Sequence, residues 1–157
     1  MAGEPRGIAV ASGEGEVIRS PIGGDVRFVA RGAHTDGAMT ALDVAVPPGQ
    51  GPPLHLHHEQ DEAVYVLEGN VRWKLGEELS ASREGSFVFI PRGLAHCFQN
   101  VGDAPARLMI TFMPAGMESF FELQAHLSAF DPEAFRSAAA ENGMEVVGPP
   151  LAESDPL

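Results

Sequence analysis

The chain has only one cysteine, Cys97, in 157 residues. A single cysteine excludes an internal disulfide and a cysteine-rich zinc site. Any metal site in this protein would therefore have to use histidine and carboxylate side chains. We expect Cys97 itself to be a small buried hydrophobic residue rather than a nucleophile.

Basic side chains are also few, because 10 Lys and Arg stand against 22 Asp and Glu, a formal net charge of -12 at pH 7. No Lys or Arg cluster offsets this charge, so phosphate backbones and anionic lipid surfaces are repelled. Long apolar runs are absent as well, since no segment approaches the roughly 20 apolar residues that span a bilayer. We therefore expect a cytoplasmic protein with no nucleic-acid partner and no membrane partner.

What the chain does contain is 44% hydrophobic residues, together with 18 Gly and 13 Pro. Between Val26 and Met113 the apolar residues fall mainly in short runs separated by Gly, Pro or charged turns. Val71, Trp73 and Leu75 alternate with Arg72 and Lys74, which is typical of a strand with one buried face. This part of the chain predicts an all-β barrel or sandwich.

After Pro114 the apolar residues adopt helical spacing. They are Met117, Phe120, Phe121, Ala125 and Leu127. A second helix is predicted to follow, with Asp131 as its N-cap, Pro132 at its first position and Gly143 as its stop. Phe120 and Phe121 could close the mouth of the barrel or only dock the helix on it, and we expect docking.

We divide the chain into an N-terminal arm (1–24), a barrel (25–115) and a C-terminal helical segment (116–157) that packs on the barrel. No internal repeat or low-complexity linker supports a second domain. The strand from Val26 to Val29 is predicted to be an edge of the sheet. Because small barrels commonly cover such edges by pairing, we expect a homodimer.

Three histidines are placed to converge on one point. His55 and His57 are two residues apart, so on a strand their rings leave the same face, whereas His58 points the other way. His96 follows a turn that contains Pro91 and Gly93, and it would come from the neighbouring strand. Neutral imidazoles that converge in this way favour a divalent transition metal ion.

A carboxylate would add the negative charge that a divalent ion requires. Glu59 and Asp61 have the same strand parity as the two first histidines, whereas Glu62 does not. A turn or bulge within residues 58–61 would reset that parity and bring Glu62 into the site. Spacing alone leaves all three carboxylates open.

Two segments of the chain resemble the paired signature motifs of the cupin family. The first motif contains Gly49, His55, His57, Glu62 and Gly69, and the second contains Gly85, Pro91, Gly93, His96 and Asn100. The resemblance implies a double-stranded β-helix, also called a jelly-roll barrel, with one or two C-terminal helices. It also implies that His55, His57, Glu62 and His96 bind one divalent ion of Fe, Ni, Mn, Co, Cu or Zn inside the barrel.

Three histidines and one carboxylate leave positions open on an octahedral ion, as a catalytic or ligand-binding site requires. The site resembles that of quercetinase-like single-domain cupins, which implies an oxygenase acting on a small aromatic or enolisable substrate. Glu62 would be the catalytic residue, as a general base. The alternatives are an oxygen-independent isomerase or polyketide-type cyclase, and a cupin that only binds a small ligand.

Aromatic residues in the barrel are candidates for a substrate pocket. We assign Trp73, Phe98 and Phe112 to it, since aromatic side chains could line a site for a flat ligand. Phe98 is the strongest of the three, because it has the same strand parity as His96. Asn100 is expected to form the hydrogen bonds of a turn.

Overall fold

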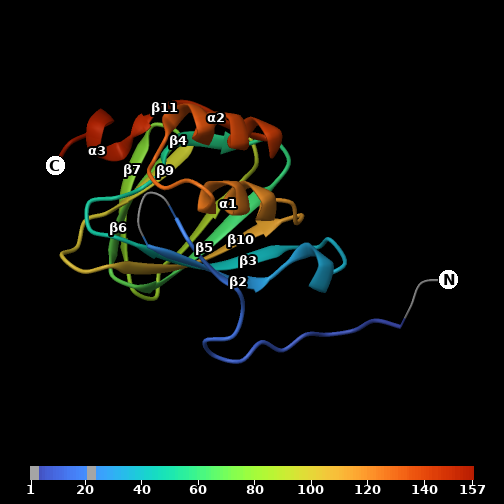
Figure 1. The fold of residues 1–157 in the computed structure, drawn as a ribbon. Coiled ribbons are helices and arrows are strands. Elements are labelled where there is room, and N and C mark those ends of the chain that lie inside the picture. The colour runs from blue at the N-terminus through green and yellow to red at the C-terminus, as the bar shows by residue number, and fades with distance from the viewer. Residues whose placement is uncertain (1–3, 21–23) are drawn as a thin grey trace.

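Two antiparallel β-sheets face each other in the computed structural model, which describes residues 4–20 and 24–157. The six-stranded sheet has the order β1 (Val17–Arg19), β2 (Asp25–Ala30), β3 (Thr40–Val46), β10 (Ala106–Met113), β5 (Asp61–Glu68), β8 (Phe87–Ile90). The five-stranded sheet has the order β11 (Met144–Pro150), β4 (Pro53–His57), β9 (His96–Asn100), β6 (Asn70–Leu75), β7 (Glu78–Arg83). Figure 1 shows β11, β4 and β9 above β10, β3 and β2. The all-β prediction is confirmed.

The core lies between the two sheets and is built from the alternating residues of their strands. Val71 and Trp73 of β6 are 1% and 0% exposed, as the alternation predicts. Trp73 also satisfies its ring N–H, since Nε1 donates to Ser82 Oγ over 2.7 Å. Leu42 of β3 and Leu108 of β10 are fully buried from the opposite sheet.

Asn100 organises the turn at the end of β9. Its Nδ2 donates to the carbonyls of Val46 and Ala104 over 2.9 and 2.8 Å. Its Oδ1 accepts from the N–H of Gly102 over 2.8 Å. The turn role expected for this motif residue is confirmed, and the side chain ties β9 to the end of β3.

The predicted second helix is α2 (Pro132–Glu141). The Asp131 carboxylate accepts from the N–H groups of Glu133 and Ala134, and Pro132 is the first helical residue. The helix ends before Gly143, which has a φ of +68° that favours glycine. Both ends of α2 therefore lie where the residue types predict.

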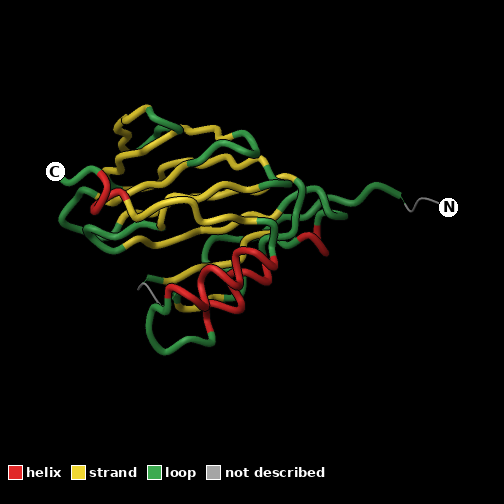
Figure 2. Tube along the Cα trace, turned by 90° about the horizontal axis from the view of Figure 1, so that it is seen from above, coloured by secondary structure: helices red, strands yellow, loops and turns green. Residues whose placement is uncertain are grey.

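Helices α1 (Glu118–Ala125) and α2 close one side of the sandwich. Helix α1 contacts β1 at the edge of one sheet, α2 contacts β11 at the edge of the other, and the two helices contact each other. Figure 2 shows both helices on one side of the strands. The helices therefore bridge the gap between the two sheet edges. A 3-10 turn, η1 (Gly32–His34), follows β2.

Two parts of the chain differ from the boundaries drawn above. Within the expected arm 1–24, residues 1–3 and 21–23 lie outside the described residues, and β1 pairs with β2. The segment 116–157 contains β11 and a short third helix, α3 (Leu151–Ser154), besides the two predicted helices. Strand β11 contains Gly148, Pro149 and Pro150, which obscure a strand pattern but are tolerated at a sheet edge.

The predicted edge strand Val26 to Val29 is not an edge, because β2 pairs with β1 on one side and β3 on the other. An exposed aromatic patch lies at the opposite end of this sheet, where Tyr65, Phe87 and Phe89 are 46%, 64% and 52% exposed on β5 and β8. The homodimer stays a prediction. Among the described residues, no helix combines the length and apolarity needed to cross a membrane.

Candidate metal centre

The four residues implied by the cupin motifs come together between the sheets. His55 and His57 lie on β4, and His96 lies on β9 directly opposite His55. Glu62 lies on β5 of the other sheet. One donor atom from each residue falls within a group in which all atoms lie within 4.8 Å of one another. All four side chains are buried, and they are 6%, 3%, 1% and 4% exposed in the order named.

The choice among the three carboxylates is made by the corner between the sheets. Residues 58–60 carry the chain from β4 in one sheet to β5 in the other, so strand parity does not continue through them. Asp61 instead forms an ion pair with Arg92 at 3.1 Å, and Glu59 is exposed. Glu62 is the carboxylate that faces the histidines.

His58 points away from the cluster, as expected. Its ring is 57% exposed and its Nε2 lies 2.9 Å from Glu145 Oε2. Gly93 helps to position the cluster from the other motif, since its N–H donates to the carbonyl of His57 over 2.8 Å. Its φ of +82° forms the turn that returns the chain to His96.

Backbone carbonyls orient two of the three imidazoles. Nδ1 of His55 donates to the Pro53 carbonyl over 2.8 Å, and Nδ1 of His96 donates to the Leu94 carbonyl over 2.8 Å. A carbonyl can only accept, so the proton of each ring sits on Nδ1 and Nε2 is left for the cluster. Nδ1 of His57 has no hydrogen-bond partner among the described residues, and its Nε2 lies 3.3 Å from Glu62 Oε2 without the geometry of a hydrogen bond. A buried imidazole whose nitrogens lack a geometric hydrogen bond is suited to bind a metal ion.

The charges of the cluster suit ligand roles. Burial lowers the pKa of His55 well below its ordinary value, and the neighbouring His96 and His57 lower it further, so this ring is neutral. Burial alone would raise the pKa of Glu62. His96 and His57 outweigh burial and lower this pKa far below its ordinary value. The Nε2 of His96 lies 2.9 Å from Glu62 Oε2. The site thus offers neutral imidazole and ionised carboxylate, a donor set that fits a divalent transition metal ion.

His96 behaves differently from His55 because it touches the carboxylate. Burial lowers the pKa of His96, but the charge of Glu62 and the hydrogen bond to it outweigh burial and raise the pKa. A metal ion and this proton would compete for the same Nε2. Metal binding should therefore release a proton from the His96 and Glu62 pair.

A cavity of about 100 Å³ opens from the cluster into the space between the sheets and the helices. His55, His57 and Glu62 line one part of it, and most of the remaining wall is apolar. Phe98 and Phe112, two of the three aromatic residues assigned to a substrate pocket, line this cavity. The Phe112 ring lies 5.1 Å from the His57 ring, centroid to centroid, so aromatic carbon borders the donor atoms directly.

Trp73 does not line this cavity, in contrast to its assignment from sequence. It lies behind Phe98, with ring centroids 5.2 Å apart, and it is fully buried in the core. Both residues point inward from neighbouring strands, and alternation alone cannot tell which of two inward residues is nearer the cavity. Phe98 therefore separates Trp73 from a ligand in the cavity.

The helical segment docks on the barrel and also forms part of the cavity wall. Phe120 and Phe121 of α1 line it, although Phe120 also packs on Phe135 of α2 at 5.2 Å between ring centroids. Met117, Gln124 and Met144 line it as well and were not predicted. Met117, Phe120, Phe121 and Gln124 are spaced so that they lie on one face of the helix, which is the sequence signal for their shared position on the cavity wall.

Cys97 is fully buried, and burial raises the pKa of its thiol to about 11. The ordinary thiol pKa is about 8.5, so the folded state disfavours the reactive thiolate. We predict that iodoacetamide labels Cys97 at pH 8 far more slowly in the folded protein than after unfolding in urea. The protection should be lost as the pH rises from about 8.5 through about 11. The contribution of the protonated thiol to the free energy of unfolding should be lost over the same pH range. Mass spectrometry would measure the labelling of both states over time. Equal labelling rates in the folded and the unfolded protein at pH 8 would contradict a buried inert thiol.

Comparisons with known proteins relate this chain to a described domain family. A family model described as "Cupin domain" matches residues 42–112. The chain is 33% identical over 93 residues to protein SchB of Streptomyces halstedii, which covers 59% of this chain and 67% of that protein. It is 31% identical over 93 residues to polyketide synthase CurC of Streptomyces cyaneus, which covers 59% of this chain and 60% of that protein.

Among solved structures, KdgF from Halomonas sp. superposes with a TM-score of 0.62 at 19% identity, covering 69% of this chain and 94% of that chain. This likeness concerns the fold alone. The chain spans between 14% and 67% of the length of the curated relatives that it matches. The activities of those relatives are therefore a hypothesis for this chain.

Proposed function

This chain belongs to the cupin family, and on that premise we propose that it is a metal-dependent enzyme that cyclises or isomerises a small, enolisable, polyketide-type compound without oxygen. The observation that carries the proposal is the position of the four-donor cluster at one part of an otherwise apolar cavity. A substrate oxygen would face the donors while its carbon skeleton contacts the apolar wall. A divalent ion held by His55, His57, Glu62 and His96 would supply Lewis acidity toward an enolate oxygen.

The chain's own residues would bind and orient the substrate. Phe98, Phe112 and Phe120 line the cavity, and burial of an apolar ligand against them would exclude water from the reacting atoms. The carbonyls of Pro53 and Leu94 fix the ring orientations of His55 and His96, so two donors are held in place before a substrate arrives.

Glu62 is the one carboxylate among the described residues that line the cavity. We therefore keep it as the candidate catalytic base, which would accept a proton from the substrate carbon between two carbonyl groups. The electron pair of that C–H bond would form the C=C bond of an enolate while the carbonyl π pair moves to the oxygen. The enolate carbon would then either be reprotonated by Glu62 or attack a second carbonyl carbon of the substrate, whose π pair moves to its oxygen and takes the proton from Glu62. The lowered pKa keeps Glu62 ionised at neutral pH, as a metal ligand requires.

The polyketide part of the proposal is supported by the relatives rather than by the cavity. CurC is described as a polyketide synthase, and its match covers 59% of this chain and 60% of CurC. An oxygenase with a quercetinase-like site remains the second candidate, since three imidazoles and a carboxylate accept redox-active Fe, Ni, Mn, Co or Cu as readily as Zn.

The deciding experiment compares turnover with and without oxygen. Metal-loaded protein would be incubated with aromatic β-diketones and flavonols, under strict anaerobiosis and in air, with product masses and oxygen consumption recorded. We expect products that have the substrate mass, or that mass less water, at equal rates under both conditions. Products that form only in air with oxygen uptake would show an oxygenase instead. Saturable binding without any product would show a ligand-binding protein.

A further inference from the structure

Gln124 is a polar side chain on the apolar wall of the cavity. It lies on α1, it is 5% exposed, and it lines the cavity together with Phe120 and Phe121 of the same helix. Its Oε1 is buried and has no hydrogen-bond partner among the described residues. An amide that leaves water without gaining a partner costs stability, and a leucine would fill the same space without that cost.

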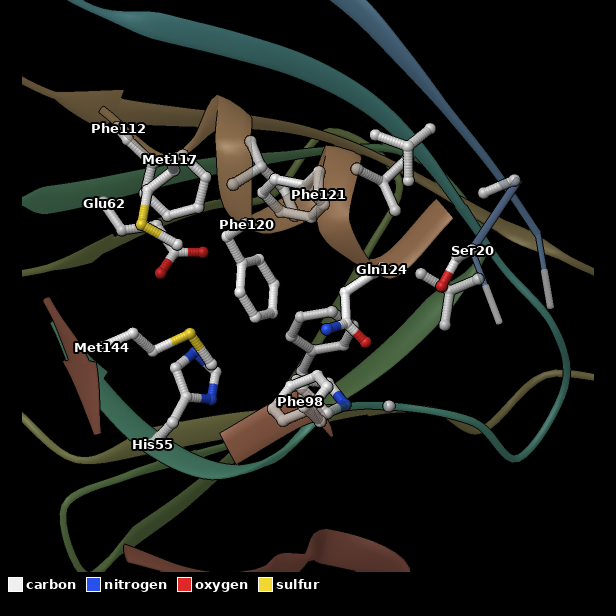
Figure 3. A pocket seen from close by; sticks show the side chains of 18 of the residues that line it. Ser20, His55, Glu62, Phe98, Phe112, Met117, Phe120, Phe121, Gln124 and Met144 are labelled. Carbon is white, nitrogen blue, oxygen red and sulfur yellow. The ribbon is translucent and has the colours of Figure 1, made fainter. Parts of the chain in front are cut away.

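The position of Gln124 relative to the metal centre is visible in Figure 3, where Glu62 and His55 lie on one side, Gln124 and Ser20 lie on the other, and Phe120 lies between them. All five residues line the same cavity. A ligand that reaches the four donors with one end and extends along Phe120 would therefore present its other end to the amide of Gln124. The ligand would supply the missing hydrogen-bond partner.

We propose that Gln124 is a specificity-determining residue whose amide binds a hydroxyl or carbonyl group at the far end of the substrate. The inference rests on the proposed function and deepens it by naming the substrate class. That class is an elongated aromatic compound with an enolisable oxygen at one end, an apolar middle and a hydroxyl or carbonyl at the other end. An amide suits both groups, since it donates through Nε2 and accepts through Oε1.

A matched pair of ligands tests the assignment. The probes are 1-phenylbutane-1,3-dione and 1-(4-hydroxyphenyl)butane-1,3-dione, which have the same enolisable end and differ only by the distal hydroxyl. Their dissociation constants would be measured by calorimetry on zinc-loaded wild type and on Gln124→Leu. We expect wild type to bind the hydroxylated probe about two- to tenfold more tightly, which is the usual size of one buried hydrogen bond. Gln124→Leu should lose that preference and keep its affinity for the unsubstituted probe.

Gln60→Leu is the matched control. Gln60 is also a buried glutamine, 4% exposed, with an unpartnered Oε1, but it does not line the cavity. This variant should keep the preference for the hydroxylated probe. The metal content of all three proteins is measured in parallel, so that a change at the centre is not mistaken for a change at the amide.

Thermal unfolding separates specificity from a structural role. Because Gln124→Leu removes an unpartnered polar group, its midpoint should equal or exceed that of wild type without ligand. A lower midpoint together with equal weakening of both probes would show that Gln124 is structural and would overturn the inference.

The remaining outcomes distinguish the inference from the proposed function. Equal affinity of wild type for the two probes, or a preference that survives in Gln124→Leu, would overturn the role of Gln124 alone. Failure of wild type to bind either probe would overturn the substrate class and the role of Gln124 with it. A preference that depends on Gln124 in a protein without turnover would overturn the catalytic proposal and leave the inference standing.

Discussion

Replacement of His57 by alanine is expected to lower the bound metal from about one ion per chain to less than about a tenth of that amount. His57 is 3% exposed, and its nearest acidic partner is Glu62 of the same cluster, with Nε2 3.3 Å from Oε2, so its ring nitrogens face the donor group. Glu62→Ala should have the same effect, because it removes the one negative charge of the cluster. Elemental analysis of untagged protein, purified identically for each variant, measures the result.

His58→Ala is the matched control for this prediction. His58 is the next residue in the chain, but its ring is 57% exposed and pairs with Glu145 outside the cluster. Its variant should retain the metal content of wild type. The assignment of the metal centre is wrong if wild type carries no metal and cannot be reloaded. It is also wrong if His57→Ala retains as much metal per chain as His58→Ala. Far-UV circular dichroism would show that each variant is folded.

Replacement of Trp73 by alanine should lower the free energy of unfolding by about 3–5 kcal/mol. The side chain is 0% exposed, packs against Phe98 and donates to Ser82, so its loss leaves a cavity and removes one hydrogen bond. Urea unfolding followed by circular dichroism is the suitable measurement, because Trp73 is the only tryptophan and fluorescence would disappear with it.

Phe87→Ala provides the comparison for Trp73→Ala. Phe87 is also an aromatic residue on a strand, but it is 64% exposed on the outer face of β8. Its replacement should change the free energy of unfolding by less than about 0.5 kcal/mol. Similar losses in the two variants would contradict the assignment of Trp73 to the core and of Phe87 to the surface.

Local patterns in the sequence were sufficient where the physical cause is local. The alternation of Val71 and Trp73 predicts an inward face, because successive strand residues point to opposite sides. Asp131, Pro132 and Gly143 predict both ends of α2, because capping and φ preferences act within one turn. Asn100 predicts a turn for the same reason.

The motif spacing also identified the four residues that converge, but only through the resemblance to cupins. Parity along one strand left Glu59, Asp61 and Glu62 open. The choice falls on Glu62 because the chain changes sheets after β4, and the geometry of a corner depends on how both sheets pack.

Sequence patterns did not predict which residues form the cavity wall. Apolar periodicity shows that Trp73, Phe98 and Phe120 are buried, but it does not show which of them borders empty space. That depends on the positions of α1, α2 and β11 against sheet edges far away in the chain. The sequence by itself determined the alternating strands of the barrel, both ends of α2 and the three histidines that converge. Only the tertiary structure decided which carboxylate faces the histidines and placed the amide of Gln124 in the cavity, because both depend on contacts between segments distant in sequence.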